Sequence, residues 1–327
     1  MRFLVRRLGF YLVAAWAAVT VNFFIPRAMP GNAVDSMMAK FPNLQPNAQK
    51  ALEAEFGVGH QGSLLHQYGV YLGHLLHGNL GVSTAAYPAT VTEVLGNTIP
   101  WTVALVGTAT IISFVLGTML GILAGWRRGG RFDQLLPAFT FLQATPYFFL
   151  ALIAIQLFSN DWHLFPGYGG ATLGVNVGFN GAFIGSAIHH GILPAATIIV
   201  TSMAGWMLQM RNVMITTIGE DYVLAAEAKG LSTRRVMFTY AARNAILPNI
   251  AGFALAIGFV VAGALVMEIV FSYPGVGYQL YNAVTQDDFP VMQGIFLAIS
   301  ATVLLACLLA DVAYVIADPR TRRRAAF

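Results

Sequence analysis

Residues 219–248 read GEDYVLAAEAKGLSTRRVMFTYAARNAILP and form the only long polar interval in the second half of a chain otherwise dominated by apolar runs. The interval begins with two carboxylates, Glu220 and Asp221. A run of small residues follows, made up of Ala225, Ala226, Ala228 and Gly230. Small residues on a short helix let another chain approach closely, and a glycine at the end stops a helix. The pattern therefore predicts a docking surface and not a catalytic pocket.

The composition around this interval is that of an integral membrane protein. Apolar residues make up 57% of the chain and charged residues only 10%, and the mean hydropathy is +0.66. The net charge of +4 comes from basic residues in short loops beside apolar runs, where membrane topology explains them. The sequence lacks the interleaved aromatic and basic residues of nucleic-acid binders, so we expect lipid and no nucleic acid as a partner. Cys307 is the only cysteine, which excludes an intrachain disulfide.

Apolar runs set the expected fold. Six of them approach or exceed the roughly 20 residues that a helix needs to cross a bilayer. They cover residues 8–26, 100–125, 135–158, 192–218, 248–271 and 291–316. We therefore predict an all-α membrane protein with six transmembrane helices. A secretory or twin-arginine signal is the alternative for the first run, because Arg2, Arg6 and Arg7 precede it, but the run is long and lacks a clear cleavage site.

The predicted spans divide the chain into three parts. Residues 1–97 combine the first span with a long external loop, in which leucines and tyrosines between residues 64 and 76 recur at helical spacing and predict an amphipathic helix. Residues 98–318 form a five-helix core, where Gly117, Gly121 and Gly125 put small residues on one helix face for close packing. Residues 319–327 form a basic tail.

The distribution of basic residues gives the orientation. Fifteen of the eighteen lysines and arginines fall on one side of the predicted spans, and only Arg27, Lys40 and Lys50 fall on the other. Basic residues are enriched in cytoplasmic loops, so both termini and the 219–248 loop are expected in the cytoplasm. The chain is then a multi-pass protein of the cytoplasmic (inner) membrane.

Neither a nucleotide site nor a metal site is expected in this chain. It carries no G-x-x-x-x-G-K-[ST] phosphate-binding loop, so ATP must bind elsewhere if ATP drives the protein. His74 and His77 lie three residues apart and could share a helix face, but a structural metal site needs further ligands and no cysteine is near. We therefore interpret them as interfacial histidines.

Several polar residues within the predicted spans are candidates for a translocation path. An ionisable group at the bilayer centre costs roughly 2.5 to 3.5 kcal/mol of insertion free energy, so the presence of Glu268 and Asp311 within predicted spans requires an explanation. Glu268 fits either a path or partner-interface residue or a carboxylate bonded within the bundle, while Asp311 favours a structural pairing. Trp206, Gln209 and Met210 could line a path or equally pack at a dimer face.

The 219–248 loop resembles the cytoplasmic coupling loop, or EAA loop, of ABC importer permeases, and most closely that of the peptide permease family. The matching residues are Gly219, Glu220, Asp221, Tyr222, Val223, Ala226, Ala228, Lys229, Gly230, Leu231, Ser232, Arg243, Asn244, Ala245, Ile246, Leu247 and Pro248. Leu224 stands where the general pattern has glutamate, and the Leu-Pro pair lies five residues farther on, as in the peptide branch. Similar family phrases occur at residues 67–83 and 268–277.

The resemblance implies a type I ABC importer permease fold and no catalytic residue in this chain. It implies as partners a second, similar permease that forms a heterodimer, two cytoplasmic ATPase subunits that bind ATP and magnesium, and an external substrate-binding protein. The residues implied to couple to an ATPase are Glu220, Asp221, Tyr222, Ala225, Ala226, Ala228, Lys229, Gly230, Arg234 and Arg235.

The resemblance also implies short peptides as the substrate, moved by alternating access. Oligosaccharides or another small solute are the alternative within the same class. A secondary transporter driven by an ion gradient would instead need ionisable residues at mid-membrane. A membrane-embedded enzyme is disfavoured, because no nucleophile, base and orienting group cluster on adjacent spans.

Overall fold

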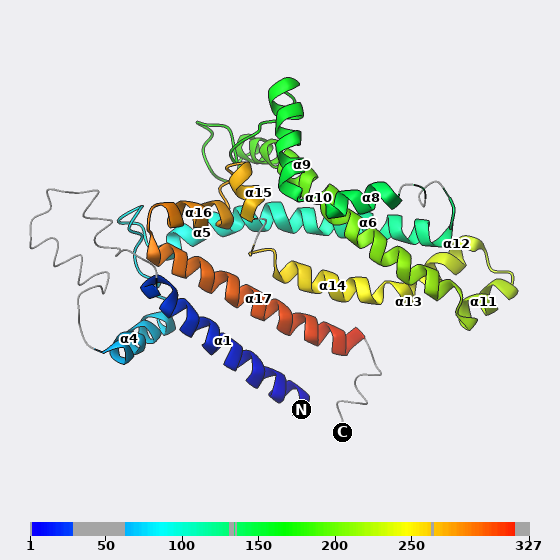
Figure 1. Cartoon of the computed structure of the whole chain (residues 1–327), viewed down its shortest axis with the longest axis horizontal. Helices are drawn as coiled ribbons and strands as arrows, with labels where there is room; N and C mark the ends of the chain where they lie inside the picture. The colour runs from blue at the N-terminus through cyan, green and yellow to red at the C-terminus, as the bar shows by residue number, and fades with distance from the viewer. Residues whose placement is uncertain (1, 29–62, 131–133, 135, 263–264, 318–327) are drawn as a thin grey trace, which may run out of the picture. The chain divides into compact units, whose positions relative to one another are not determined.

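The computed structural model describes residues 2–28, 63–130, 134, 136–262 and 265–317 (Figure 1). Over these residues the chain is helical, and its only extended pairing is an isolated antiparallel bridge between Val82 and Thr90. It folds as two compact units, which we describe separately. Unit 1 comprises Met1–Thr102, Val261–Leu265 and Pro274–Leu305, and unit 2 comprises Val103–Val260, Val266–Tyr273 and Ala306–Phe327.

Unit 1 contains α1 (Arg2–Ala28), α4 (Leu64–Leu76), α5 (Val91–Thr102), α16 (Val276–Thr285) and most of α17 (Phe289–Ala317). Its core is formed where α5, α16 and α17 meet, with Val91, Leu280 and Ile295 among the buried residues. Helix α1 joins α17 through paired hydrogen bonds: Asn22 Nδ2 donates to the Gln293 carbonyl at 2.9 Å, and Gln293 Nε2 donates to the Asn22 carbonyl at 3.1 Å.

The residues of the predicted amphipathic helix form the helix α4. It begins at the extended residue Ser63, whose Oγ accepts a hydrogen bond from the His66 backbone at 3.4 Å, a normal N-cap arrangement. The ring of Tyr68 packs edge-on against Phe23 of α1 at a centroid distance of 5.1 Å. The α4 helix thus uses its tyrosines to contact α1, whereas Leu65 and Leu76 stay exposed.

Unit 2 contains the remaining helices and most of α15 (Leu265–Val270). In chain order the others are η1 (Val103–Gly107), α6 (Thr108–Trp126), α8 (Leu136–Ala144), α9 (Tyr147–Ala154), η2 (Ile155–Asp161), α10 (Gly181–Ile218), α11 (Asp221–Ala228), α12 (Thr233–Arg235), η3 (Val236–Ala242), α13 (Arg243–Ala245) and α14 (Leu247–Gly258). The elements η1, η2 and η3 are π-helical turns.

Helices α6 and α10 form the closest contact in unit 2, and they run alongside each other in Figure 1. The predicted glycine face of α6 lies in this contact. A Cβ atom at Gly117 would meet the Met203 carbonyl oxygen at 2.5 Å, and one at Gly121 would meet the Met207 carbonyl oxygen at 2.6 Å. The backbones of α6 and α10 can approach this closely only because the residues of α6 at the contact are glycines, which lack side chains.

The six predicted spans correspond to four helices that are long and apolar enough to cross a membrane, or five if one bent pair is counted. The four are Arg7–Ile25, Val91–Trp126, Gly181–Ile218 and Phe289–Leu309. The predicted count of six transmembrane helices is therefore not confirmed over the described residues. Two of the predicted spans, at 135–158 and 248–271, are not single helices.

The third predicted span bends by 98° between Leu136–Ala144 and Tyr147–Asp161. Pro146 lies at this bend with a non-helical backbone, at φ −56° and ψ 126°. Proline cannot donate a backbone hydrogen bond and disfavours helical geometry in the residue before it, here Thr145, so the first helix stops there.

The fifth predicted span is divided as well. Helix α14 has only 12 residues and ends at Gly258, and α15 has six. A Cβ atom at Gly258 would collide with the Cβ atom of Ala306 on α17. The glycine thus allows close helix packing, although glycine is also a poor helix former.

The fourth span begins eleven residues earlier than predicted, at Gly181 and not at Ile192. The side chain of Asn180 caps this earlier start, because its Oδ1 accepts a hydrogen bond from the Phe183 backbone at 2.8 Å. Pro194 lies inside the helix and does not mark its entrance. Prolines are tolerated within membrane helices when neighbouring groups satisfy the freed carbonyl.

Candidate functional site

The 219–248 loop folds as a short helix, α11, followed by a second helical stretch. This second stretch consists of α12, η3 and α13 and covers residues 233–245. Helix α11 starts after Glu220, which is extended, and ends at Ala228, with Lys229 as its C-cap. Gly230 follows with a φ of +72°, the left-handed conformation that a glycine adopts without strain. Its backbone N–H donates to the Glu227 carbonyl at 2.8 Å. The predicted glycine stop is confirmed.

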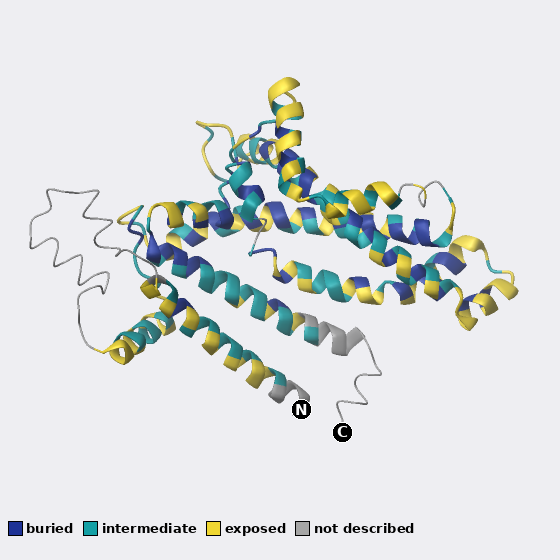
Figure 2. Cartoon of the chain, in the orientation of Figure 1, coloured by how far each residue is buried: buried dark blue, intermediate teal, exposed yellow. Residues whose placement is uncertain are grey.

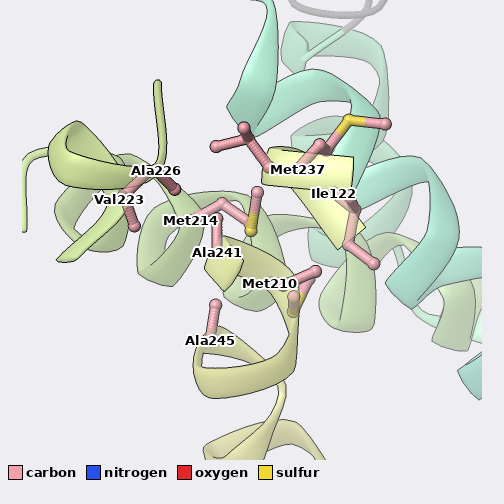
Figure 3. Close-up of a cluster of buried hydrophobic side chains, with 10 residues drawn as sticks. Ile122, Met210, Met214, Val223, Ala226, Met237, Ala241 and Ala245 are labelled. Carbon is pink, nitrogen blue, oxygen red and sulfur yellow. The ribbon is translucent and has the colours of Figure 1, made fainter. Parts of the chain in front are cut away.

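Helix α11 rests on a buried hydrophobic cluster (Figure 3). Val223 and Ala226 of α11 pack there with Ile122 from α6, Met210 and Met214 from α10, and Met237, Ala241 and Ala245 from the second stretch. The remaining members are Val236 and Ala242. Interiors packed in this way transmit displacement because they have few voids. The cluster therefore joins α11 to the inner ends of α6 and α10.

The opposite face of α11 is exposed (Figure 2). Asp221, Leu224, Ala225 and Ala228 follow the i, i+3, i+4, i+7 spacing that places residues on one side of a helix, and all four are exposed. Leu224, the residue that departs from the family pattern, is 51% exposed and lies within this face. We call these four residues the α11 outer face.

The ten residues implied to couple to an ATPase divide into two groups. Ala226 is 2% exposed and belongs to the buried cluster, so it supports the helix from inside. The other nine are exposed: Glu220, Asp221, Tyr222, Ala225, Ala228, Lys229, Gly230, Arg234 and Arg235. Arg234 also lines a cavity of about 690 Å³ with Trp126, Arg127 and Met237.

A second cavity in unit 2, of about 650 Å³, lies between α6, α8, α10 and α14. We call it the four-helix cavity. Its described lining residues are Thr110, Ser113, Gln143, Ser202, Gly205, Trp206, Leu208, Gln209, Asn212 and Ala256. Its polar groups are hydroxyls and carboxamides, and none of these described residues is charged.

Only two of the four predicted path residues meet in this cavity. Trp206 and Gln209 line it. Met210 is fully buried in the hydrophobic cluster below α11, one residue further around the helix. Glu268 is fully buried in α15 and does not contribute to the described lining of either cavity.

A family comparison identifies the class of protein that carries these features. The family model described as "Binding-protein-dependent transport system inner membrane component" matches residues 117–323, which include the second half of α6, all of α10, the 219–248 loop and most of the residues that line the four-helix cavity. The chain belongs to this family. This inner membrane component is thus a subunit of a transport system and not an enzyme.

Relatives match this inner membrane component over almost its whole length. A di/tripeptide transport system permease protein, DppB, of Pseudomonas aeruginosa is 32% identical over 99% of both chains. The dipeptide transport system permease protein DppB of Escherichia coli is 31% identical over 99% of both. An oligopeptide transport system permease protein, AppB, of Bacillus subtilis is 30% identical over 97% of this chain and 98% of the relative.

Some residues at these sites were not predicted from the sequence. Leu224 was noted only as a departure from a pattern, although its spacing from Asp221 and Ala228 marks the same helix face. Gln143 was missed because it lies on α8, far along the chain from Gln209. Polar residues spaced along the α10 face, Ser202, Gln209 and Asn212, were the available signal for the cavity.

Proposed function

We propose that this inner membrane component is one of two permease subunits of an ATP-driven importer, and that it moves short peptides across the cytoplasmic membrane. Three relatives that match it from end to end carry names of dipeptide, di/tripeptide or oligopeptide permeases. Peptides are therefore the first substrate class to test, ahead of oligosaccharides or other small solutes.

The observation that carries the proposal is the two-sided character of α11. Its outer face, with Asp221, Leu224, Ala225 and Ala228, is available to a partner, while Val223 and Ala226 are locked into the buried cluster. A cytoplasmic ATPase subunit that closes on ATP would push on the outer face. The packed cluster would then displace α6 and α10 together, since interiors resist compression.

The partners follow from the same reasoning. This chain has no phosphate-binding loop, so ATP and magnesium bind to the ATPase subunits. A second, non-identical permease completes the passage, and an external binding protein delivers the substrate. No cofactor is held by this chain.

We further propose a type I permease topology with six crossings and both termini in the cytoplasm. The four long helices and the bent α8–α9 pair supply five crossings. Helices α14 and α15, with the turn between them, would supply the sixth as a broken crossing. Broken helices are tolerated at membrane depth where protein buries them.

Replacing Ala225 with tryptophan tests the docking role. Ala225 is exposed on the α11 outer face, so a bulky side chain there should prevent close approach of the ATPase without disturbing the buried cluster. We expect peptide uptake by the assembled transporter to fall at least about tenfold, in line with the loss of a central interface contact.

Ala182→Trp provides the matched control. Ala182 is also exposed and helical, but it lies in the first turn of α10. Its variant should retain uptake and ATPase association. Normal uptake by Ala225→Trp would contradict the docking role, and peptide transport by the purified chain alone would contradict the ATP-driven class.

A further inference from the structure

We propose that the four-helix cavity holds the peptide by its backbone amides, through the carboxamides of Gln143, Gln209 and Asn212, and thereby accepts peptides regardless of side-chain charge. This inference rests on the proposed peptide transport and adds the chemical basis of selectivity. It concerns residues on α8 and α10 that line one space.

The cavity lining matches the chemistry of a peptide bond. A carboxamide carries an N–H donor and a C=O acceptor, as a backbone amide does, so each can exchange a pair of hydrogen bonds with a passing peptide. The hydroxyls of Thr110 and Ser113 donate to the Val106 and Thr110 carbonyls at 2.7 and 3.0 Å, so their oxygens can accept hydrogen bonds from a peptide. Ser202 adds a hydroxyl that can both donate and accept. None of the described lining residues has a charge that would attract or repel a charged peptide side chain.

The position of these groups argues against a lipid-facing role. Ser202, Gln209 and Asn212 are exposed on α10, one of the four helices long and apolar enough to cross a membrane. Gln143 is exposed on α8, within the bent pair. Polar groups without partners in hydrocarbon cost several kcal/mol each, so this face must meet water, protein or substrate.

The cavity wall is built to stay open. The Trp206 ring meets Phe114 edge-on at a centroid distance of 5.4 Å, and a Cβ atom at Gly252 would lie 3.2 Å from the Trp206 ring. A Cβ atom at Gly205 would lie 3.6 Å from Gln143 Nε2, an ordinary van der Waals distance, so Gln143 reaches across to the α10 backbone at this point. The braced indole holds this side of the cavity in place.

Among the described residues, Arg211 contacts a residue of the cavity lining. Arg211 Nη1 donates to Asn212 Oδ1 at 3.4 Å. This bond occupies part of the oxygen's acceptor capacity and leaves the Asn212 amide N–H₂ able to donate to a peptide carbonyl. Because Arg211 is present in every variant considered below, its effect cancels when variants are compared with the wild type.

The test introduces a charge without changing the size of a lining residue. Uptake of Ala-Ala-Ala, Ala-Glu-Ala and Ala-Lys-Ala is measured at pH 7 for the complete transporter with Gln209→Glu. A carboxylate in the cavity should repel the acidic peptide, so the uptake ratio of Ala-Glu-Ala to Ala-Lys-Ala should fall about tenfold relative to wild type. Gln209→Leu, which removes the hydrogen bonds, should lower uptake of all three peptides alike.

Gln286→Glu is the matched control, since Gln286 is an exposed residue at the end of α16, outside the cavity lining. It should leave the uptake ratio unchanged. The inference is overturned if Gln209→Glu keeps the wild-type ratio, or if it lowers uptake of all three peptides equally. If the wild-type transporter takes up none of the three, the proposed peptide function fails, which is a separate result.

Discussion

At the scale of single residues, the carboxylate of Asp288 holds together two distant segments of unit 1. It is 1% exposed and directly precedes α17. Its Oδ2 accepts hydrogen bonds from the Ser83 hydroxyl and from the Ala85 backbone, the latter at 3.1 Å. Its Oδ1 accepts from the backbone of Thr84 at 3.2 Å and of Val291 at 3.3 Å. One side chain thus caps α17 and fixes the segment before α5.

Asp288→Asn should destabilise unit 1. The amide has a single oxygen in place of two, and its N–H₂ group would face backbone N–H donors. We expect a loss on the order of 1–3 kcal/mol for each buried donor left without a partner, seen as a lower melting temperature in detergent. Asp221→Asn, the same change at an exposed carboxylate of α11, should melt near wild type. Equal melting of both variants would contradict this role.

The structural role of Asp288 could not be predicted from the sequence. Asp287 and Asp288 look alike as a polar pair before an apolar run. Asp288 differs from Asp287 in that it contacts residues 83–85, about two hundred positions earlier in the chain. A local sequence pattern cannot predict a contact between residues so far apart in the chain. Gly230 is the contrasting case, since its helix-ending role depends on local backbone geometry and was predicted.

At the scale of elements, the contact between α6 and α10 organises unit 2. The glycine face of α6 was predicted from its four-residue spacing, but its partner helix could not be. Asn249 of α14 joins the pair, because its Nδ2 donates to Thr118 Oγ1 at 3.4 Å and to the Trp206 carbonyl at 3.3 Å. A buried carboxamide therefore links three helices beside the four-helix cavity.

Gly121→Val should disrupt this contact. A Cβ atom at Gly121 would lie 2.6 Å from both the Met207 carbonyl oxygen and Met210 Cβ, so the helices must separate. Overpacking of this kind costs roughly 1–3 kcal/mol, and a lower melting temperature in detergent would report it. Gly96→Ala provides a control in α5, where nothing lies within 4 Å and the change should be neutral or stabilising. A wild-type melting temperature for Gly121→Val would contradict the close approach.

At the scale of the whole molecule, the sequence predicts the membrane class, the helical composition and most helix positions. It overestimates how many spans are single continuous helices, because an apolar run indicates burial in lipid and not the straightness of a helix. Pro146 and Gly258 show where this matters: each interrupts a run that hydropathy alone joins. The basic tail and the first half of the long external loop lie outside the described residues.

Cysteine labelling tests the proposed orientation. Cys307 is the only native cysteine and can be replaced with serine. In that background, Lys229→Cys in the 219–248 loop should react with an impermeant thiol reagent only in inside-out vesicles. Leu173→Cys, at a side chain that is 98% exposed, should react only in intact, right-side-out vesicles. The reverse pattern would place the loop outside and remove the basis for ATPase docking.

The length of α10 has a consequence for where a partner can meet this protein. Its 38 residues rise about 57 Å, at 1.5 Å per residue, whereas the hydrocarbon layer is only about 30 Å thick. Even if α10 tilts by about 40° from the bilayer normal, its length along the normal is roughly 44 Å, enough to cross both head-group regions. Helix α11 starts at Asp221, three residues after α10 ends, so a partner subunit would contact it in the aqueous phase, where added salt should weaken contacts with Asp221.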